Sequence, residues 1–230
     1  METGNERKAM NSSDTGSFWD RTWKDIDPER IKAYADNSDT GPDAVIAFLK
    51  GRGVRLVCDA GCGCGVYALK LAKHGFCVSG FDIAEDAVEL AKKLLSDNGY
   101  PTEGFRRASV LDTGWADASF DAVVAKDVVD HMPISQGTEA IKELMRLVRP
   151  SGHLILCLDA TDGEYESEPH ETNADGDYLY TSGKWEGMAF HPYSPEEINK
   201  LTKDFGCDML PGDGNGFTVL ISKPVTAQGE

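Results

Sequence analysis

The sequence predicts an α/β protein with a doubly wound, mostly parallel sheet, and three observations support this fold class. Strand-like and helix-like stretches alternate between residues 54 and 158. A glycine-rich turn at residues 61–65 joins the first strand of this alternation to its first helix. Two strand-like stretches near the end of the chain follow one another without a helix, so they must pair antiparallel. Alternation with right-handed crossovers builds a parallel sheet that helices cover.

The composition restricts the class of protein. The chain has 230 residues and a net charge of −16, from 23 basic and 39 acidic side chains, and its length suits one domain. Such acidity argues against nucleic-acid and anionic-membrane partners, because both require clustered positive charge. No apolar run approaches the roughly 20 residues of a membrane span. The six cysteines do not suggest a disulfide framework, and the N-terminus lacks an apolar signal region. We therefore expect a cytoplasmic protein.

Three regions are predicted in chain order. Residues 1–17 are polar and are expected to form a disordered tail. Residues 18–53 are expected to form an N-terminal helical cap, with one helix opening at Pro28 and a second restarting after Pro42. Residues 54–230 then form the core domain.

The first core elements follow from hydrophobic periodicity and from turn residues. Strands are expected at residues 54–58, 76–81, 105–111, 120–125 and 153–158, alternating with helices at 66–74, 84–96 and 137–148. The largely apolar run at 120–125 suits a strand that is covered on both faces.

The last part of the chain departs from this alternation. Residues 160–192 are rich in acids and aromatics and too long for an ordinary connection, so they form a lid or a small insertion. A capping-box sequence, Ser194-Pro195-Glu196-Glu197, opens a helix that stops at Gly206. The remaining elements are the two strands that must pair antiparallel, at residues 207–210 and 216–222.

The strongest motif is Gly61-Cys62-Gly63-Cys64-Gly65, which follows the first strand. Glycines permit a tight turn and let a ligand approach the bare backbone at the start of a helix. A dinucleotide-binding loop would place glycine or alanine at position 66, where this chain has Val66. Asp59, two residues before the first glycine, favours an amine-bearing or positively charged ligand over a pyrophosphate.

Two further acids follow the next two predicted strands. Asp82 closes the second strand, where a carboxylate can accept hydrogen bonds from ribose hydroxyls. Asp112 closes the third, where it can accept a bond from the exocyclic amine of adenine. With Asp59, these carboxylates lie at the carboxyl ends of neighbouring strands, the edge at which open α/β sheets bind ligands.

With these motifs, the stretch from Val54 to Ser222 resembles the small-molecule branch of the class I S-adenosylmethionine-dependent methyltransferases. The runs at residues 120–124 and 147–152 also look like that family's later strand and turn signatures. The resemblance implies a seven-stranded sheet with its last strand antiparallel, and S-adenosyl-L-methionine as the cofactor.

The resemblance also implies which residues bind the cofactor. It places the glycine loop beside the methionine and ribose parts, the second strand's end at the ribose and the third strand's end at the adenine. Lys126 departs from the residue that is usual for the family at its position. The implied cofactor-binding residues are Asp59, Gly61, Cys62, Gly63, Asp82, Ile83, Leu111, Asp112, Ala125 and Lys126.

Several patterns have two interpretations. Trp19 and Trp23 are spaced i, i+4 and either cover the cofactor's sulfonium or pack an N-terminal helix. The acids of residues 160–192 form either a solvated loop or a lid that favours a cationic substrate. Cys62 and Cys64 are interpreted as small residues that the turn tolerates. We predict no metal, because Asp127, Asp159 and the lid acids show no decisive ligand spacing.

His131 is the candidate catalytic residue. It follows the fourth predicted strand, where a neutral imidazole can take a proton from a hydroxyl or amine nucleophile, or can hold its loop by a hydrogen bond. His191 has a weaker claim to the same role, and a structural turn histidine is the preferred interpretation there.

The predicted function is methyl transfer from S-adenosyl-L-methionine to an O, N or S nucleophile of a small molecule, with a cationic acceptor as one option. A non-catalytic member that binds the cofactor as a sensor or partner module is the first alternative. An NAD-dependent oxidoreductase is the second, and Val66 and the helix-free final strands count against it. The sequence predicts neither the acceptor nor the oligomeric state.

Overall fold

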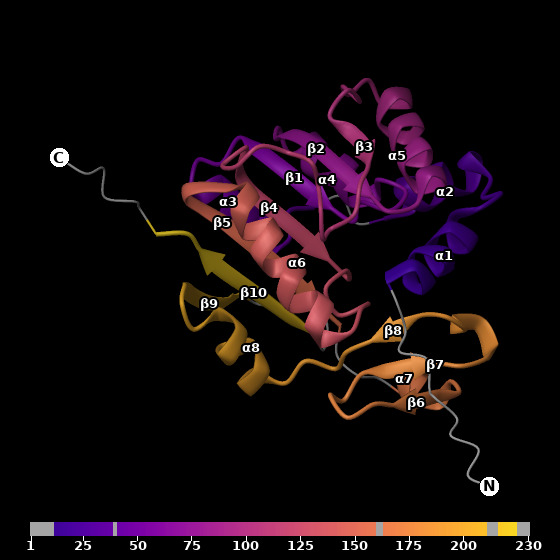
Figure 1. Ribbon diagram of the computed structural model, residues 1–230. Coiled ribbons are helices and arrows are strands. Elements are labelled where there is room, and N and C mark those ends of the chain that lie inside the picture. The colour runs from indigo at the N-terminus through magenta and orange to yellow at the C-terminus, as the bar shows by residue number, and fades with distance from the viewer. Residues whose placement is uncertain (1–11, 39–40, 160–162, 211–215, 225–230) are drawn as a thin grey trace, which may run out of the picture.

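The computed structural model describes residues 12–38, 41–159, 163–210 and 216–224, and it confirms the predicted fold class. Seven strands form one sheet in the order β3-β2-β1-β4-β5-β10-β9 (Figure 1). Strands β1 to β5 run parallel, and β10 is antiparallel to both of its neighbours. The strands of this sheet are β1 (Leu56–Ala60), β2 (Cys77–Asp82), β3 (Phe105–Arg107), β4 (Phe120–Lys126), β5 (Val148–Leu158), β9 (Gly206–Leu210) and β10 (Phe217–Ser222).

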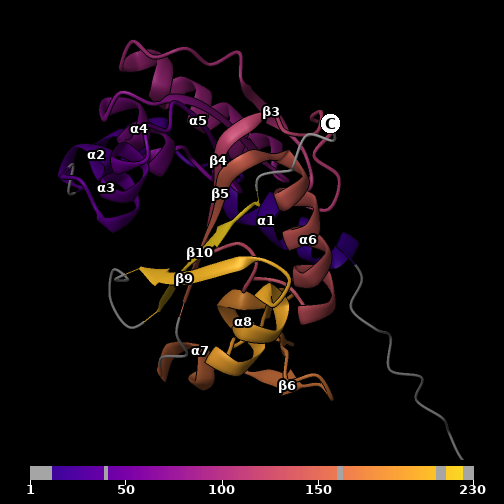
Figure 2. The same cartoon turned by 90° about the vertical axis from the view of Figure 1, so that its left-hand side faces the viewer.

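Helices cover both faces of the sheet (Figure 2). Alternate residues of each central strand enter two separate apolar clusters, as the two-residue period of a strand requires. Ile141 and Leu144 of α6 pack with Ile198 of α8 on one face, whereas Ile46 of α3 and Leu71 of α4 pack on the other. The bounds of these four helices and of two others, α2 and α5, are α2 (Pro28–Asn37), α3 (Ala44–Gly51), α4 (Val66–Lys73), α5 (Glu85–Asp97), α6 (Ile134–Leu147) and α8 (Pro195–Thr202).

The third strand is shorter than predicted. β3 stops at Arg107, which pairs with Asp82, the last residue of β2. As an edge strand, β3 has no other neighbour, so the ladder ends where β2 ends. Ser109 and Asp112 then form an isolated bridge within a turn. The prediction that Asp112 closes the third strand is therefore wrong.

Helix α1 (Ser12–Trp23) begins inside the segment predicted to be a disordered tail. Residues 1–11 of that segment lie outside the described residues. The later part is ordered because Phe18 is only 6% exposed and packs against aromatic residues of the insertion, while Gly16 lies against Ile83. Contacts with distant parts of the chain thus override the polar composition.

The insertion predicted at residues 160–192 carries a small sheet of its own. Three short antiparallel strands pair in the order β6-β7-β8 below the main sheet in Figure 1. Phe18, Tyr180, Met188 and Phe190 form its apolar cluster. The described elements are α7 (Gly163–Ser167), β6 (His170–Thr172), β7 (Tyr178–Tyr180), the 3₁₀ helix η1 (Gly183–Trp185) and β8 (Ala189–Phe190).

A buried histidine–aspartate pair ties this insertion to the core. The ring Nδ1 of His191 lies 2.8 Å from Asp177 Oδ1, and both side chains are almost fully buried. The backbone N–H of Ile134, at the start of α6, donates to the same carboxylate oxygen. The His191 side chain does not line the cavity described below, so its position agrees with the structural role preferred for it.

The last helix and the final two strands form as predicted, except that α8 ends at Thr202, and Gly206, expected to stop the helix, is the first residue of β9. Ser194 and Glu197 make a complete capping box at the start of α8. β9 and β10 pair antiparallel from Thr218 opposite Leu210 to Ser222 opposite Gly206. No helix in the described part of the chain has the length and apolarity that crossing a membrane requires.

Gly65 permits the close approach of two core helices. Its φ is +82°, and a Cβ at this position would lie 2.8 Å from the Cα of Ala91 in α5. Gly75 has a similar φ of +91°, but a Cβ there meets no described atom within 4 Å.

We therefore expect Gly65→Ala to lower the free energy of unfolding by about 2–5 kcal/mol, because a left-handed backbone penalty adds to overpacking. Gly75→Ala is the matched control and should cost only the backbone penalty of about 1–2 kcal/mol. Urea denaturation measures both variants. Equal losses would contradict the close packing of α4 against α5.

Candidate functional site

A cavity lies at the carboxyl ends of β1, β2 and β4, beneath α1. Its volume of about 260 Å³ is many times the space that one water molecule needs. Six of the predicted site residues line it: Gly61, Gly63, Asp82, Ile83, Leu111 and His131. The rest of the lining consists of Trp19, Trp23, Phe81, Ala108, Ser109, Val110, Asp127, Val128, Met132 and Gln136.

The glycine loop brings bare backbone to the cavity. Gly61 and Gly63 have φ values of +69° and +49°, which side-chain-bearing residues rarely adopt. A Cβ on Gly61 would lie 2.4 Å from Val128 Cγ2, and one on Gly63 would lie 3.0 Å from the Trp23 ring. Glycine is therefore required both by the turn and by the side chains that pack against it.

Asp82 anchors the loop from the end of β2. Its Oδ2 accepts a hydrogen bond of 2.9 Å from the Gly63 N–H, and its Oδ1 accepts one of 3.0 Å from the Ala84 N–H. The side chain is 7% exposed, and burial raises its pKa. A carboxylate has about four lone-pair sites, so two remain for a ligand's hydroxyls.

Asp59 lies beneath the loop and does not line the cavity. It is 2% exposed, and its Oδ2 is buried without a hydrogen-bond partner among the described residues. Burial, followed by the neighbouring Asp82 carboxylate, raises the pKa of Asp59 to about 7. Asp59 therefore lies within β1 behind the glycine loop, close to Asp82 and to the first turn of α4.

Four other predicted cofactor-binding residues lie away from the cavity lining. Cys62 is buried, with its thiol directed to the Gly63 carbonyl, and Ala125 is buried within β4. Lys126 pairs with Asp127 at 3.2 Å. Asp112 is exposed in the turn after β3. Asp112 was expected at the end of the third strand, but β3 ends five residues before it.

Helix α1 closes the cavity from the side of the N-terminus. Trp19 and Trp23 both line it, and Trp19 also packs against the aromatic cluster of the insertion, so the second interpretation of their spacing describes part of its contacts. Asp20 lies 3.9 Å from Arg107, and Arg21 donates a hydrogen bond of 2.8 Å to the Glu186 carbonyl. One short helix thereby contacts both the core and the insertion.

His131 connects the cavity to the insertion. Its ring stacks on Trp19, with centroids 5.6 Å apart and an interplanar angle of 5°. Its Nε2 lies 3.3 Å from the Tyr165 hydroxyl, which donates a hydrogen bond of 2.7 Å to Asp159 Oδ2. The ring Nδ1 is buried and has no hydrogen-bond partner among the described residues. The predicted candidate base therefore has two polar neighbours that the sequence did not assign to it.

Acidic residues surround His131. Burial is the main cause that raises the pKa of Asp127, and it raises that of Asp130 to about 6. Asp159, one of the acids weighed for a metal, forms with Asp130 and His131 a group whose possible ligand atoms all lie within 4.8 Å of one another. The Tyr165 hydroxyl already contacts two of these three side chains, so the described residues form a hydrogen-bonded chain there.

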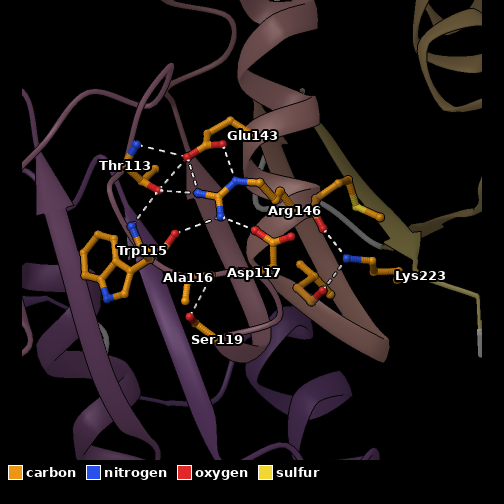
Figure 3. Close-up of polar contacts among 10 residues, drawn as sticks. Thr113, Trp115, Ala116, Asp117, Ser119, Glu143, Arg146 and Lys223 are labelled. Atoms are coloured by element: carbon orange, nitrogen blue, oxygen red, sulfur yellow. Dashed lines mark hydrogen bonds and ion pairs between the residues drawn. The ribbon is translucent and has the colours of Figure 1, made fainter.

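The loop that follows β3 is held by an ionic network on α6 (Figure 3). Glu143 Oε1 accepts hydrogen bonds of 3.0 and 2.7 Å from the Thr113 backbone and hydroxyl. Arg146 makes two bonds of 2.7 Å to the Glu143 carboxylate and one of 2.8 Å to the Trp115 carbonyl. Because residues 108–111 of this loop line the cavity, the network positions one cavity wall. Glu143 and Arg146 were not singled out from the sequence, although their i, i+3 spacing on a predicted helix could have indicated the pair.

Comparison with known proteins identifies a shared domain. Residues 58–156 match the family model described as a methyltransferase domain. The magnesium-protoporphyrin O-methyltransferase of Synechocystis is 34% identical over 112 residues, which are 46% of this chain and 46% of that protein. The ubiquinone biosynthesis O-methyltransferase of Paracidovorax citrulli is 32% identical over 46% of this chain and 43% of that protein. The chain spans about half the length of the curated relatives that it matches.

Solved structures share the fold over more of the chain. A methyltransferase described as SAM-dependent, from Methanosarcina mazei, is 25% identical with a TM-score of 0.59, and the match covers 74% of this chain and 93% of that one. A magnesium protoporphyrin IX methyltransferase from Synechocystis, solved with bound SAM, has a TM-score of 0.56 at 22% identity over 90% of each chain. At that identity the likeness shows the fold.

The Glu143 network predicts a dependence of stability on pH. The Arg146 guanidinium and Thr113 lower the pKa of Glu143 to about 2, below the value of 4.5 that is usual for a free side chain. A depressed folded-state pKa contributes stability that is present above about pH 4.5 and is lost as the pH falls towards 2. We expect Glu143→Gln to lower the free energy of unfolding by about 1–3 kcal/mol at pH 7, and this difference should shrink with acid.

Denaturant melts between pH 2.5 and 7 measure this effect. Glu139→Gln, an exposed position on the same helix, is the control and should follow the wild-type slope. A constant difference between Glu143→Gln and wild type across this range would contradict the assigned network.

Proposed function

Because the chain belongs to the class I S-adenosylmethionine-dependent methyltransferases, we propose that it transfers a methyl group from S-adenosyl-L-methionine to an O, N or S atom of a small molecule. The observation that carries the proposal is the cavity itself. It brings glycine backbone, the Asp82 carboxylate and two tryptophans together at the carboxyl ends of the parallel strands.

The residues present fit this cofactor. The two lone-pair sites that Asp82 leaves unused suit the two ribose hydroxyls. The positive-φ backbone of Gly61 and Gly63 lets the methionine part approach closely. Ile83 and Leu111 offer apolar surface to the adenine. These five residues form the proposed contact set, and Asp59 supports them from below.

The chain's own task in this reaction is alignment and exclusion of water. The cofactor supplies an activated methyl group on a sulfonium, so an acceptor lone pair that lies in line with it needs little further chemical help. Trp19 and Trp23 present aromatic faces that favour a cation and keep water out. His131 is the proposed acceptor of the proton that an O–H or N–H nucleophile loses.

We propose a small-molecule acceptor and a cytoplasmic location. The net charge of −16 disfavours nucleic acid as the substrate. Oxygen is the first nucleophile to test, because several of the curated relatives are named as O-methyltransferases. Asp127 in the cavity wall keeps a cationic acceptor as an option. All six cysteines are free thiols, as a reducing compartment would leave them.

Binding of S-adenosylhomocysteine tests the cofactor site. Calorimetry should show binding to the wild-type protein and no heat with NADH. Asp82→Ala should weaken the binding by about 1–3 kcal/mol, since partners of the carboxylate lose their hydrogen bonds. Asp86→Ala removes an exposed acid of the same charge nearby and should bind as wild type does. Unchanged affinity in Asp82→Ala would remove this residue from the site.

Turnover separates an enzyme from a cofactor-binding sensor. Labelled S-adenosylmethionine and a metabolite extract should give labelled small molecules whose appearance requires the protein. Tight cofactor binding with no label transfer to any extract or acceptor panel would favour the sensor.

A further inference from the structure

A series of hydrogen-bonding side chains connects His131 to the insertion. Aligning the cofactor with an acceptor does not by itself require such a series. It begins at His131 Nε2, passes through the Tyr165 hydroxyl at 3.3 Å and ends at Asp159 Oδ2, a further 2.7 Å away. His131 borders the cavity, whereas the Asp159 side chain is 43% exposed. The three residues therefore link the covered cavity to water.

The direction of the hydrogen bonds fixes the state of the imidazole. An ionised carboxylate can only accept, so the single hydroxyl proton of Tyr165 points to Asp159. The hydroxyl oxygen then faces His131 Nε2 with a lone pair, and Nε2 must carry the proton. In the neutral ring this leaves the basic lone pair on Nδ1, the nitrogen that has neither a partner nor contact with water in the described chain.

We infer that Tyr165 and Asp159 are positioning residues that hold His131 in the Nε2–H form and carry its proton to solvent, an inference that rests on the proposed methyl transfer. When an acceptor X–H is methylated, the X–H bond breaks and its proton bonds to Nδ1, which the acceptor reaches once the imidazole or the stacked Trp19 ring has moved aside. The Nε2 proton then moves to the Tyr165 oxygen as the hydroxyl proton moves to Asp159. Asp159 releases that proton to water, and proton count and charge balance.

The surroundings of Tyr165 keep its hydroxyl in place. Its ring stacks between Phe190 and Trp185, with centroid distances of 4.1 and 4.8 Å. The Tyr180 hydroxyl donates a hydrogen bond of 3.0 Å to the Tyr165 backbone carbonyl. The hydroxyl can thus be removed by Tyr165→Phe while the packed ring remains.

Nearby charges favour the transient imidazolium. Asp127, Asp130 and Asp159 all lie close enough to interact electrostatically with one another around His131. The Lys126 ammonium nearby is paired with Asp127 at 3.2 Å. The surplus of negative charge stabilises a proton that enters the ring.

Side-chain ¹⁵N NMR of the histidines tests the tautomer without requiring turnover or a known acceptor. His131→Gln assigns one of the five histidines. At a pH where the ring is neutral, wild type should show Nε2–H, and Tyr165→Phe should lose this preference. Tyr178→Phe removes a hydroxyl from the same insertion and should leave the His131 signals unchanged. Nδ1–H in wild type, or an unaltered tautomer in Tyr165→Phe, would overturn the inference.

Proton exchange tests the transfer step. Asp159→Asn retains an oxygen that accepts from Tyr165 but cannot take up a proton. Exchange of the His131 Nε2 proton with water should therefore slow by about tenfold or more, while the tautomer remains. Exchange at the wild-type rate would reject the exit path. Calorimetry with S-adenosylhomocysteine separates failure of the proposed function from failure of this inference. A protein that does not bind the cofactor gives no heat in calorimetry, whereas the NMR spectra report only on the proton of His131.

Discussion

The structure of the site depends on the two hydrogen bonds that the Asp82 carboxylate accepts, from Gly63 and from Ala84. The first holds the glycine loop after β1, and the second holds the start of the connection to α5. One side chain at the end of a central strand therefore sets the distance between two neighbouring connections. Burial raises the pKa of this carboxyl, and the two backbone hydrogen bonds act in the opposite direction by favouring its charged form. The glycines follow from this constraint, because only a bare backbone turns tightly enough to present its N–H to Asp82.

The other walls of the cavity come from segments outside the central strands. Helix α1 supplies two tryptophans, α6 fixes the loop that follows β3 through Glu143 and Arg146, and the insertion reaches His131 through Tyr165. Each segment has its own anchor in the core. Under the proposed function, the parallel sheet holds the cofactor, and the attached segments are the parts that would select the acceptor and lead its proton away.

The central strands, the capping box of α8 and the position of Asp82 at the end of β2 could be predicted from the sequence because each depends on local signals: apolar runs, turn residues and an acid at a strand end. Asp112 could not be placed, since the length of β3 is set by where β2 stops. The order of α1 depends on Phe18 meeting aromatic residues far along the chain. The chain of His131, Tyr165 and Asp159 is likewise formed by tertiary folding, so spacing alone gave no indication of it.

The central claim is that a sulfonium nucleoside lies across the strand ends, with its ribose on Asp82 and its amino-acid part on the glycine loop. A crystal structure of the protein with S-adenosylhomocysteine tests this most directly. The account predicts ribose hydroxyls within hydrogen-bond distance of Asp82, the homocysteine part along Gly61 and Gly63, and the thioether sulfur facing the His131 side of the cavity. Nucleoside density elsewhere, or a cavity still filled by Trp19 and Trp23 at saturating ligand, would contradict it.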